Sequence, residues 1–165
     1  MAKMTIKGID EYALKLSKLG NKSQEVAGKA IYAGAQVVAD AIKRNIDSLE
    51  AVDDKYNLIA YKQGKKSKLS ETQKKGLKEA FGITKMQKDS DGFYNVKLGF
   101  DGYNDVKTKK YPNGQPNQLI AIVTESGSSF MDKTPFVRPA LNQTKKQAQE
   151  IMQKVIDEET GKIMK

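Results

Sequence analysis

The sequence predicts an α+β fold in which long α-helices pack on an antiparallel β-sheet within a single domain. Apolar residues recur at helical spacing near 23–46 and 140–159, and polar and apolar residues alternate over 93–100. Glycine and proline separate these segments. A chain of 165 residues buries roughly 70% of its unfolded surface, which suits one core and one domain over 1–165.

The amino-terminal third is expected to contain a short strand and two helices. The strand covers 4–7, and a first helix follows over 10–19, with Gly20 as its stop. A longer helix begins near Asn21 or Ser23 and continues to about Ile46, because small and aliphatic residues recur there on one stripe.

Gly28 and Gly34 lie inside this second predicted helix. Each costs about 1 kcal/mol relative to alanine in a helix interior. Close backbone packing is expected to compensate. The packing partner is either the protein's own sheet or another subunit, and the sequence leaves both alternatives open.

The middle of the chain is expected to begin with a loop and continue as a helix. Residues 47–69 mix acidic residues, tyrosines and a run of lysines, which predicts a mobile basic loop. Ser70 and Gln73 have the spacing of a capping box, so a third helix is expected to start there. Gly82 is the predicted end of that helix.

A β-hairpin is predicted after the third helix. Its strands cover 83–87 and 93–100, and Asp89-Ser90-Asp91-Gly92 forms the turn. The same four residues resemble the start of a calcium-binding loop, but the further ligands of such a loop are missing. The hairpin turn is therefore the preferred interpretation.

The remaining segments are a loop, an apolar run and a last helix. Residues 101–117 contain three glycine or proline punctuators and predict a long loop. The apolar run 119–123 fits a buried strand or a short helix, and periodicity does not decide between them. A final amphipathic helix is expected from Ala140 to about Glu159.

The composition excludes most catalytic and metal chemistry. The chain has no Cys and no His, which excludes thiol nucleophiles, histidine bases and nearly all zinc sites. Residues 63–67 resemble a phosphate loop only in part, and Asp53 with Asp54 lack converging carboxylates for Mg²⁺. We expect no catalysis, no cofactor and no metal. Neither a signal peptide nor a membrane span is recognisable, which predicts synthesis in a cytoplasm and no membrane partner.

The positive charge gathers in the middle third. The net charge of the chain is +9, and residues 55–110 carry +8 of it. Lysines near tyrosines fit non-specific contact with DNA phosphates or an acidic surface, and a solvated lysine-rich loop is the alternative. The candidate residues are Lys62, Lys65, Lys66, Lys68, Lys107, Lys109 and Lys110.

The segment 125–140, which leads into the last helix, combines an acidic residue, a glycine that ends a helix and two prolines that restrict the backbone. We call this segment the elbow. Glu125 and Gly127 are followed by Pro135-Phe136 and then by Arg138-Pro139-Ala140. Each proline disfavours the helical conformation of the residue before it, so Thr134 and Arg138 are expected to be extended. Pro139 suits the first turn of a helix.

This order of residues resembles the tail-completion or head-tail joining proteins of tailed bacteriophages, the gp ten-like family of lambdoid phages. The resemblance extends over nearly the whole chain, because the opening residues 6–10, the Ala-rich second helix and the Leu-Lys-rich third segment follow in the family's order. Two features depart from the family's pattern, namely Lys133-Thr134 before Pro135 and the long loop 101–117.

The resemblance implies a structural virion protein without catalytic activity. Such a protein is expected to form a ring, a hexamer, in the phage neck. Its neighbours would be the head-closure or connector protein and the tail terminator or tail tube protein. The resemblance also favours a helix over 119–127.

Carried over by position, the family pattern falls on Glu125, Gly127, Pro135, Phe136, Arg138, Pro139 and Ala140. We expect these residues to set the elbow into the last helix. We also expect Phe136 and Arg138 to contact a neighbouring subunit or partner ring, because an apolar anchor and an arginine share one rigid segment. A rival function from another class is a small basic DNA-binding accessory protein.

Overall fold

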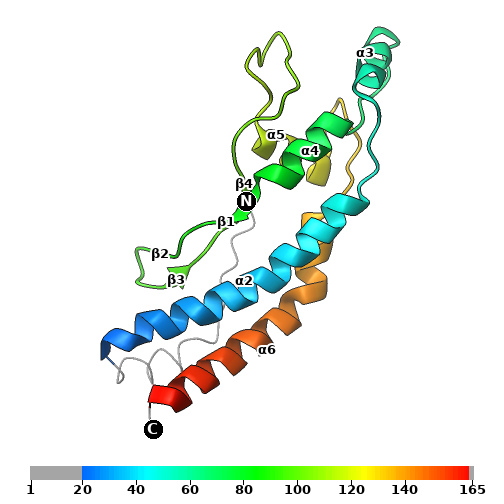
Figure 1. Ribbon diagram of the computed structural model, residues 1–165. Coiled ribbons are helices and arrows are strands. Elements are labelled where there is room, and N and C mark those ends of the chain that lie inside the picture. The colour runs from blue at the N-terminus through cyan, green and yellow to red at the C-terminus, as the bar shows by residue number, and fades with distance from the viewer. Residues whose placement is uncertain (1–19, 164–165) are drawn as a thin grey trace. The chain divides into compact units, whose positions relative to one another are not determined.

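A computed structural model of the chain describes residues 20–163 and confirms the predicted α+β class (Figure 1). The predicted strand at 4–7 and helix at 10–19 lie outside the described residues. The helices are η1 (Gly20–Lys22), α2 (Ser23–Ser48), α3 (Asp54–Lys62), α4 (Glu71–Ala80), α5 (Asn117–Ser126) and α6 (Val137–Ile163). The strands are β1 (Phe81–Ile83), β2 (Gln87–Lys88), β3 (Tyr94–Asn95) and β4 (Leu98–Phe100).

The sheet is smaller than the sequence predicts, because it consists of two separate pairs of short strands. β1 pairs with β4, and β2 pairs with β3 in antiparallel register, with Gln87 opposite Asn95. The described chain divides into two compact units. The first comprises 20–40, 83–98 and 143–163, and the second comprises 41–82 and 99–142.

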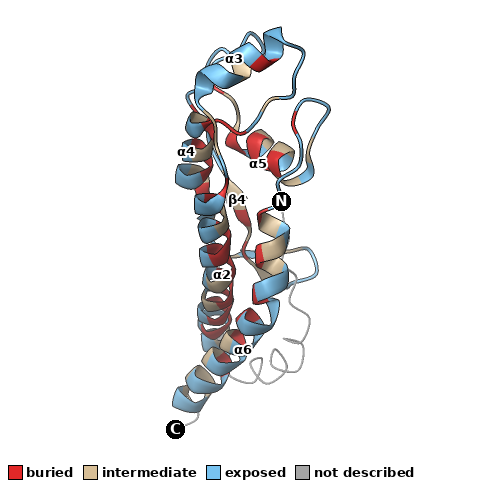
Figure 2. Ribbon diagram, turned by 90° about the vertical axis from the view of Figure 1, so that its right-hand side faces the viewer, coloured by how far each residue is buried: buried red, intermediate tan, exposed pale blue. Residues whose placement is uncertain are grey.

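The core of the first unit lies between α2 and α6. Val26, Ala30 and Val38 of α2 are buried, as are Ala148 and Met152 of α6. The buried positions of α2 lie along one side of the helix, as its predicted stripe requires (Figure 2). The helix itself matches the prediction closely, since it ends two residues beyond Ile46.

The two glycines of α2 are packed against the chain itself. A Cβ atom added at Gly34 would lie 2.5 Å from Met152 Cγ, and one added at Gly28 would lie 3.5 Å from Met86 Sδ. Gly34 therefore allows the α2 and α6 backbones to approach, and Gly28 leaves room for a methionine between β1 and β2. Both contacts are formed within the first unit.

The predicted hairpin is interrupted between its two strand pairs. The Asp89–Gly92 turn is confirmed, because Asp89 Oδ1 accepts hydrogen bonds from the backbone N–H groups of Asp91 (3.1 Å) and Phe93 (2.8 Å). The first strand is not continuous over 83–87. Tyr32 of α2 explains the break, because its hydroxyl donates to the Thr84 carbonyl (3.2 Å) and accepts from the Met86 N–H (2.8 Å).

The core of the second unit gathers around α4, α5 and the start of α6. Its most deeply buried side chains include Ile42, Ile46, Leu77 and Phe136. The capping box that starts α4 is confirmed, since Ser70 Oγ accepts from the Gln73 N–H while Gln73 Oε1 accepts from the Ser70 N–H. Gly82 does not end α4 as predicted. Phe81 is already extended and buried, so the chain passes directly into β1.

The prediction of a loop over 47–69 is wrong in its centre, where α3 forms. Asp53 caps this helix, because its Oδ1 accepts from the Lys55 N–H at 2.8 Å. Only Ala60 of α3 is buried. The segment therefore lacks the inward apolar stripe by which a helix is recognised in a sequence.

The sequence predicted the last two helices, α5 and α6, with different accuracy. Residues 119–123 belong to α5, which agrees with the helical alternative. The loop 101–117 is confirmed as irregular up to Pro116. The last helix begins at Val137, three residues earlier than predicted, and Arg138 is therefore helical rather than extended.

Replacing Gly76 by alanine is expected to destabilise the protein by about 1–3 kcal/mol, although alanine normally favours a helix. The new Cβ would lie 2.5 Å from Asn117 Oδ1 and 2.7 Å from Asn104 Cβ. Urea unfolding followed by circular dichroism measures the effect. Gly161→Ala in α6 is the matched control, because no atom lies within 4 Å there and stability should rise by up to about 1 kcal/mol. Equal stabilisation by both substitutions would contradict the close packing of Gly76.

Candidate subunit and partner interface

The elbow before α6 is organised by the carboxylate of Glu125. Its Oε2 accepts hydrogen bonds from the backbone N–H groups of Phe136 (2.7 Å) and Val137 (2.8 Å), and its Oε1 accepts from Arg138 (3.1 Å). The first N–H groups of a helix have no partner within the helix, and its amino end favours a negative charge. One side chain at the end of α5 thus caps the start of α6.

Gly127 makes the turn between the two helices possible. It adopts a φ of 77° and its N–H donates to the Val123 carbonyl at 2.8 Å, which ends α5. A Cβ at this position would lie 3.1 Å from the backbone nitrogen of Lys133. The Thr134 N–H then donates to the Thr124 carbonyl at 2.6 Å and closes the turn.

Phe136 does not present its ring to a partner, and the prediction that it does is wrong. Its side chain is 1% exposed and packs edge-on against Phe100, with ring centroids 5.9 Å apart. Phe100 in turn contacts Phe81, with ring centroids 5.1 Å apart and the rings tilted by 45°. The Asn45 side chain donates to the Phe136 carbonyl at 2.8 Å. Phe136 is an anchor of its own subunit.

Arg138 and the two prolines form the outer side of the elbow. The Arg138 side chain is 73% exposed, with Nε 3.9 Å from Glu125 Oε1, a distance at which an exposed pair contributes little. Pro135 is exposed and Pro139 is half-buried in the first turn of α6. Pro139 lies in the first turn of the last helix, as predicted, but Arg138 is helical rather than extended. Of the predicted contact pair, only Arg138 remains available to another molecule.

The seven candidate lysines are all exposed, but they form two separate groups. Lys107, Lys109 and Lys110 belong to the loop 101–116, where Lys110 Nζ lies 5.5 Å from the Tyr111 ring centroid. The other four lie at or just after the end of α3. Within the described residues, Lys62, Lys65, Lys107 and Lys109 form no ion pair. The positive charge is therefore available to solvent or to a partner.

Other lysines of the basic third are used within the fold. Lys74 Nζ donates to the carbonyl oxygens of Asp47 (3.0 Å) and Leu49 (2.7 Å), at the carboxyl end of α2. Lys78 Nζ lies 2.7 Å from Asp47 Oδ1 in the same region. These cations stabilise the helix end because its carbonyl groups carry partial negative charge.

No family model, no curated protein and no solved structure matches this chain. Within residues 20–163, no three His, Cys, Asp or Glu residues gather to hold a metal ion. In the same part of the chain, no helix is both long and apolar enough to cross a bilayer.

The short helix α3 of the second unit was not predicted from the sequence, and it carries several exposed large apolar side chains. Leu58, Ile59 and Tyr61 of α3 are 67%, 55% and 83% exposed. The local signals for the helix are its amino-terminal cap, Asp53, an acidic residue in its first turn, Asp54, and a basic residue in its last turn, Lys62. Asp54 connects α3 to the start of α4, because its carboxylate accepts hydrogen bonds from the Ser70 and Thr72 hydroxyl groups. These hydrogen bonds also lower the pKa of the Asp54 carboxyl.

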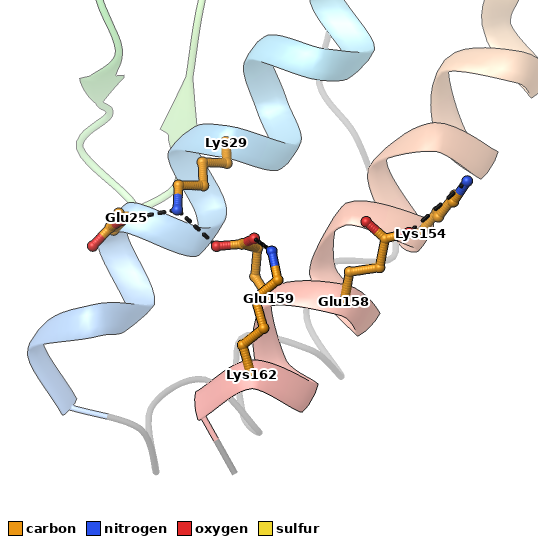
Figure 3. Close-up of polar contacts among 6 residues, drawn as sticks. All are labelled: Glu25, Lys29, Lys154, Glu158, Glu159 and Lys162. Atoms are coloured by element: carbon orange, nitrogen blue, oxygen red, sulfur yellow. Dashed lines mark hydrogen bonds and ion pairs between the residues drawn. The ribbon is translucent and has the colours of Figure 1, made fainter. Parts of the chain in front are cut away.

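An ion-pair cluster joins α2 to α6 in the first unit (Figure 3). Lys29 Nζ lies 2.7 Å from Glu159 Oε2 and 2.9 Å from Glu25 Oε1, and Lys162 Nζ lies 2.6 Å from Glu159 Oε1. Hydrogen bonds from Lys162 and Lys29 lower the pKa of Glu159 from 4.5 to about 2. Hydrogen bonds to Glu159 and Glu25 raise the pKa of Lys29 from 10.5 to about 12.

The contribution of Glu159 is expected to depend on pH. Because the folded state lowers its pKa, the stabilisation is present above about pH 4.5 and is lost as the pH falls towards about 2. This stabilisation is measured by urea unfolding of the native protein and of the Glu159→Gln variant, near neutral pH and at about pH 2. The stability difference between the two proteins should shrink in acid, and a constant difference would contradict the ion-pair role.

Proposed function

We propose that this chain is a structural protein of the neck of a tailed bacteriophage. It assembles as a ring of six copies that completes the tail and joins it to the DNA-filled head. The partners are the head-closure or connector protein on one side and the tail terminator or tail tube protein on the other. The protein is made in the host cytoplasm, ends in the virion and performs no catalysis.

The observation that carries this proposal is the capping of α6 by Glu125. The resemblance to the phage family depends on an acidic residue, a glycine, Pro-Phe and Arg-Pro-Ala in a fixed order. In the structure these residues form one physical unit, because Glu125 binds the N–H groups of Phe136, Val137 and Arg138 while Gly127 ends α5. Residues that must act together are expected to keep their order in a sequence.

The test is direct imaging of assembly. The purified protein is examined by negative-stain microscopy and light scattering, alone and with purified tails or DNA-filled heads of the parent phage. Rings, or attachment at a tail end or a head vertex, are expected. The proposal would be overturned if the protein bound neither tails nor heads under any condition. A protein that is monomeric in solution but attaches to tails would not contradict it.

A second candidate function is a small basic DNA-binding accessory protein. It is favoured by the exposed lysines of the loop 101–116, which lie near Tyr103 and Tyr111. Lysine supplies point charge without the bidentate reading of bases that arginine favours, so this binding would be non-specific. It predicts affinity for duplex DNA that falls steeply as salt is added. Strong binding in low salt without attachment to phage particles would favour this function.

A further inference from the structure

The α3 helix carries an apolar surface that the fold does not use. We name Leu58, Ile59, Tyr61, Lys62 and Lys65 the α3 patch. Leu58, Tyr61 and Lys62 have the spacing that places residues on one side of a helix. Single exposed apolar residues are ordinary on protein surfaces, but several on one nine-residue helix mark an interaction site.

Polar contacts, rather than the apolar side chains, hold α3 in place. The Asn57 side chain donates to the Lys68 carbonyl (2.8 Å) and accepts from the Lys68 N–H (2.9 Å). The Thr72 hydroxyl donates to the carboxylate of Asp54, the first residue of the helix. Leu58, Ile59 and Tyr61 are therefore free to contact another molecule without loss of the fold.

The electrostatics of the α3 patch favour an acidic counterpart. Residues 55–70 contain five lysines and no Asp or Glu. Only Lys66 among these forms an ion pair within the described chain, with Asp132. Leu58 and Ile59 add nothing to binding of phosphate groups, so a surface with both carboxylates and apolar area fits the patch better than DNA does.

Such a surface exists in the second unit, between α4 and the residues that follow β4. It is an open pocket of about 270 Å³. Its lining carries the carboxylates of Glu79, Asp101 and Asp105 against the single ammonium group of Lys75. Tyr103, which is 69% exposed, supplies an aromatic ring beside them. The pocket is thus acidic and aromatic where the α3 patch is basic and apolar.

In the part of the chain that the structure describes, each of two asparagines in the pocket lining also has one side-chain atom without a hydrogen-bond partner. Their other side-chain atoms are paired, because Asn104 Oδ1 accepts from the Val106 N–H and Asn117 Nδ2 donates to the Asp101 carbonyl. Asn104 and Asn117 are 5% and 3% exposed. Within the described residues, Asn104 Nδ2 and Asn117 Oδ1 have no partner, and an unpaired buried polar atom is costly. A hydroxyl group that enters the pocket could accept a hydrogen bond from Asn104 Nδ2 and donate one to Asn117 Oδ1, once the lining residues move slightly apart.

We propose that the α3 patch of one copy docks into the acidic pocket of the next copy. Tyr61 would enter beside Tyr103, and Lys62 and Lys65 would approach Asp101 and Asp105. The two surfaces are different parts of the same chain, so the contact is head-to-tail and closes into a ring when the rotation between copies permits. This inference rests on the proposed ring function and names the surfaces that build the ring.

The test uses two variants that each remove one side of the contact. Leu58→Ser with Tyr61→Ser removes the apolar part of the patch, and Glu79→Lys with Asp105→Lys reverses the pocket. All four side chains are exposed, so the folds should be retained. Ile122→Ser, which changes a half-exposed side chain of α5, is the control.

Sedimentation velocity at high protein concentration and low salt gives the expected result. The wild-type protein and the control form species larger than a dimer, whereas each variant alone stays monomeric. An equimolar mixture of the two variants forms a dimer and nothing larger, because only one intact patch and one intact pocket remain. Assembly weakens when the ionic strength rises from about 0.05 M to about 0.5 M.

Several results would overturn the docking and leave the proposed function standing. A wild-type protein that stays monomeric yet attaches to tails, or variants that assemble like the wild type, would do so. Loss of binding to vesicles of anionic lipid by the patch variant, with assembly unchanged, would assign the patch to a membrane surface instead. Conversely, head-to-tail assembly by a protein that ignores tails and heads would support the docking and reject the neck function.

Discussion

Replacing Phe136 by alanine is expected to lower the free energy of unfolding by about 3–5 kcal/mol, the range for removal of a buried aromatic side chain. The ring is 1% exposed and is one end of a row of three rings with Phe100 and Phe81. Its removal leaves a cavity beside the start of α6. Urea unfolding followed by circular dichroism measures the change, since the chain contains no tryptophan to report by fluorescence.

Phe130→Ala is the matched control for this substitution. Phe130 lies in the same connection between α5 and α6, but it is 75% exposed, so its removal should change stability by less than about 0.5 kcal/mol. Suppose instead that Phe136→Ala kept full stability and abolished attachment to tails. That result would show that Phe136 contacts a partner in the assembled protein and is not buried within its own subunit there.

Replacing Glu125 by alanine is expected to cost about 2 kcal/mol, at the upper end of the effects of removing a helix cap. Three backbone N–H groups, those of Phe136, Val137 and Arg138, lose their acceptor together. The carboxylate is also only 14% exposed, so water replaces it poorly. Amide hydrogen exchange should show that these three groups lose protection before the rest of α6 does.

Two further variants separate the cap from a simple charge effect. Glu125→Gln keeps an acceptor oxygen without the charge and should fall between the native protein and Glu125→Ala. Glu150→Ala removes an exposed carboxylate from the middle of α6 and should change stability by less than about 0.5 kcal/mol. Equal effects of Glu125→Ala and Glu150→Ala would show that Glu125 does not cap α6.

The elbow and the α3 patch have different consequences for a ring. Because Glu125, Gly127 and Phe136 act within one chain, substitutions there should weaken folding and assembly together. Substitutions of Leu58 and Tyr61 should weaken assembly and leave folding intact, because these side chains are exposed. Comparing the two sets of variants separates residues that build the subunit from residues that join subunits.

The features that the sequence determined by itself are those encoded by neighbouring residues. The capping box of Ser70 and Gln73, the turn at Asp89–Gly92 and the apolar stripe of α2 each depend on residues a few positions apart. Helical periodicity and turn chemistry are local properties, so they can be predicted without knowledge of the rest of the chain. The α+β class follows from them.

Tertiary structure decided which side chains are buried outside the regular stripe of α2. Phe136 appeared available as an interface anchor in the sequence, but Phe100 and Asn45, far away in the chain, enclose it. The start of α6 at Val137 depends on Glu125, twelve residues before it. The apolar residues of α3 face outward because Asn57 and Asp54 hold the helix by its polar side. At these positions burial is set by contacts between distant residues, which the local pattern of the sequence does not show.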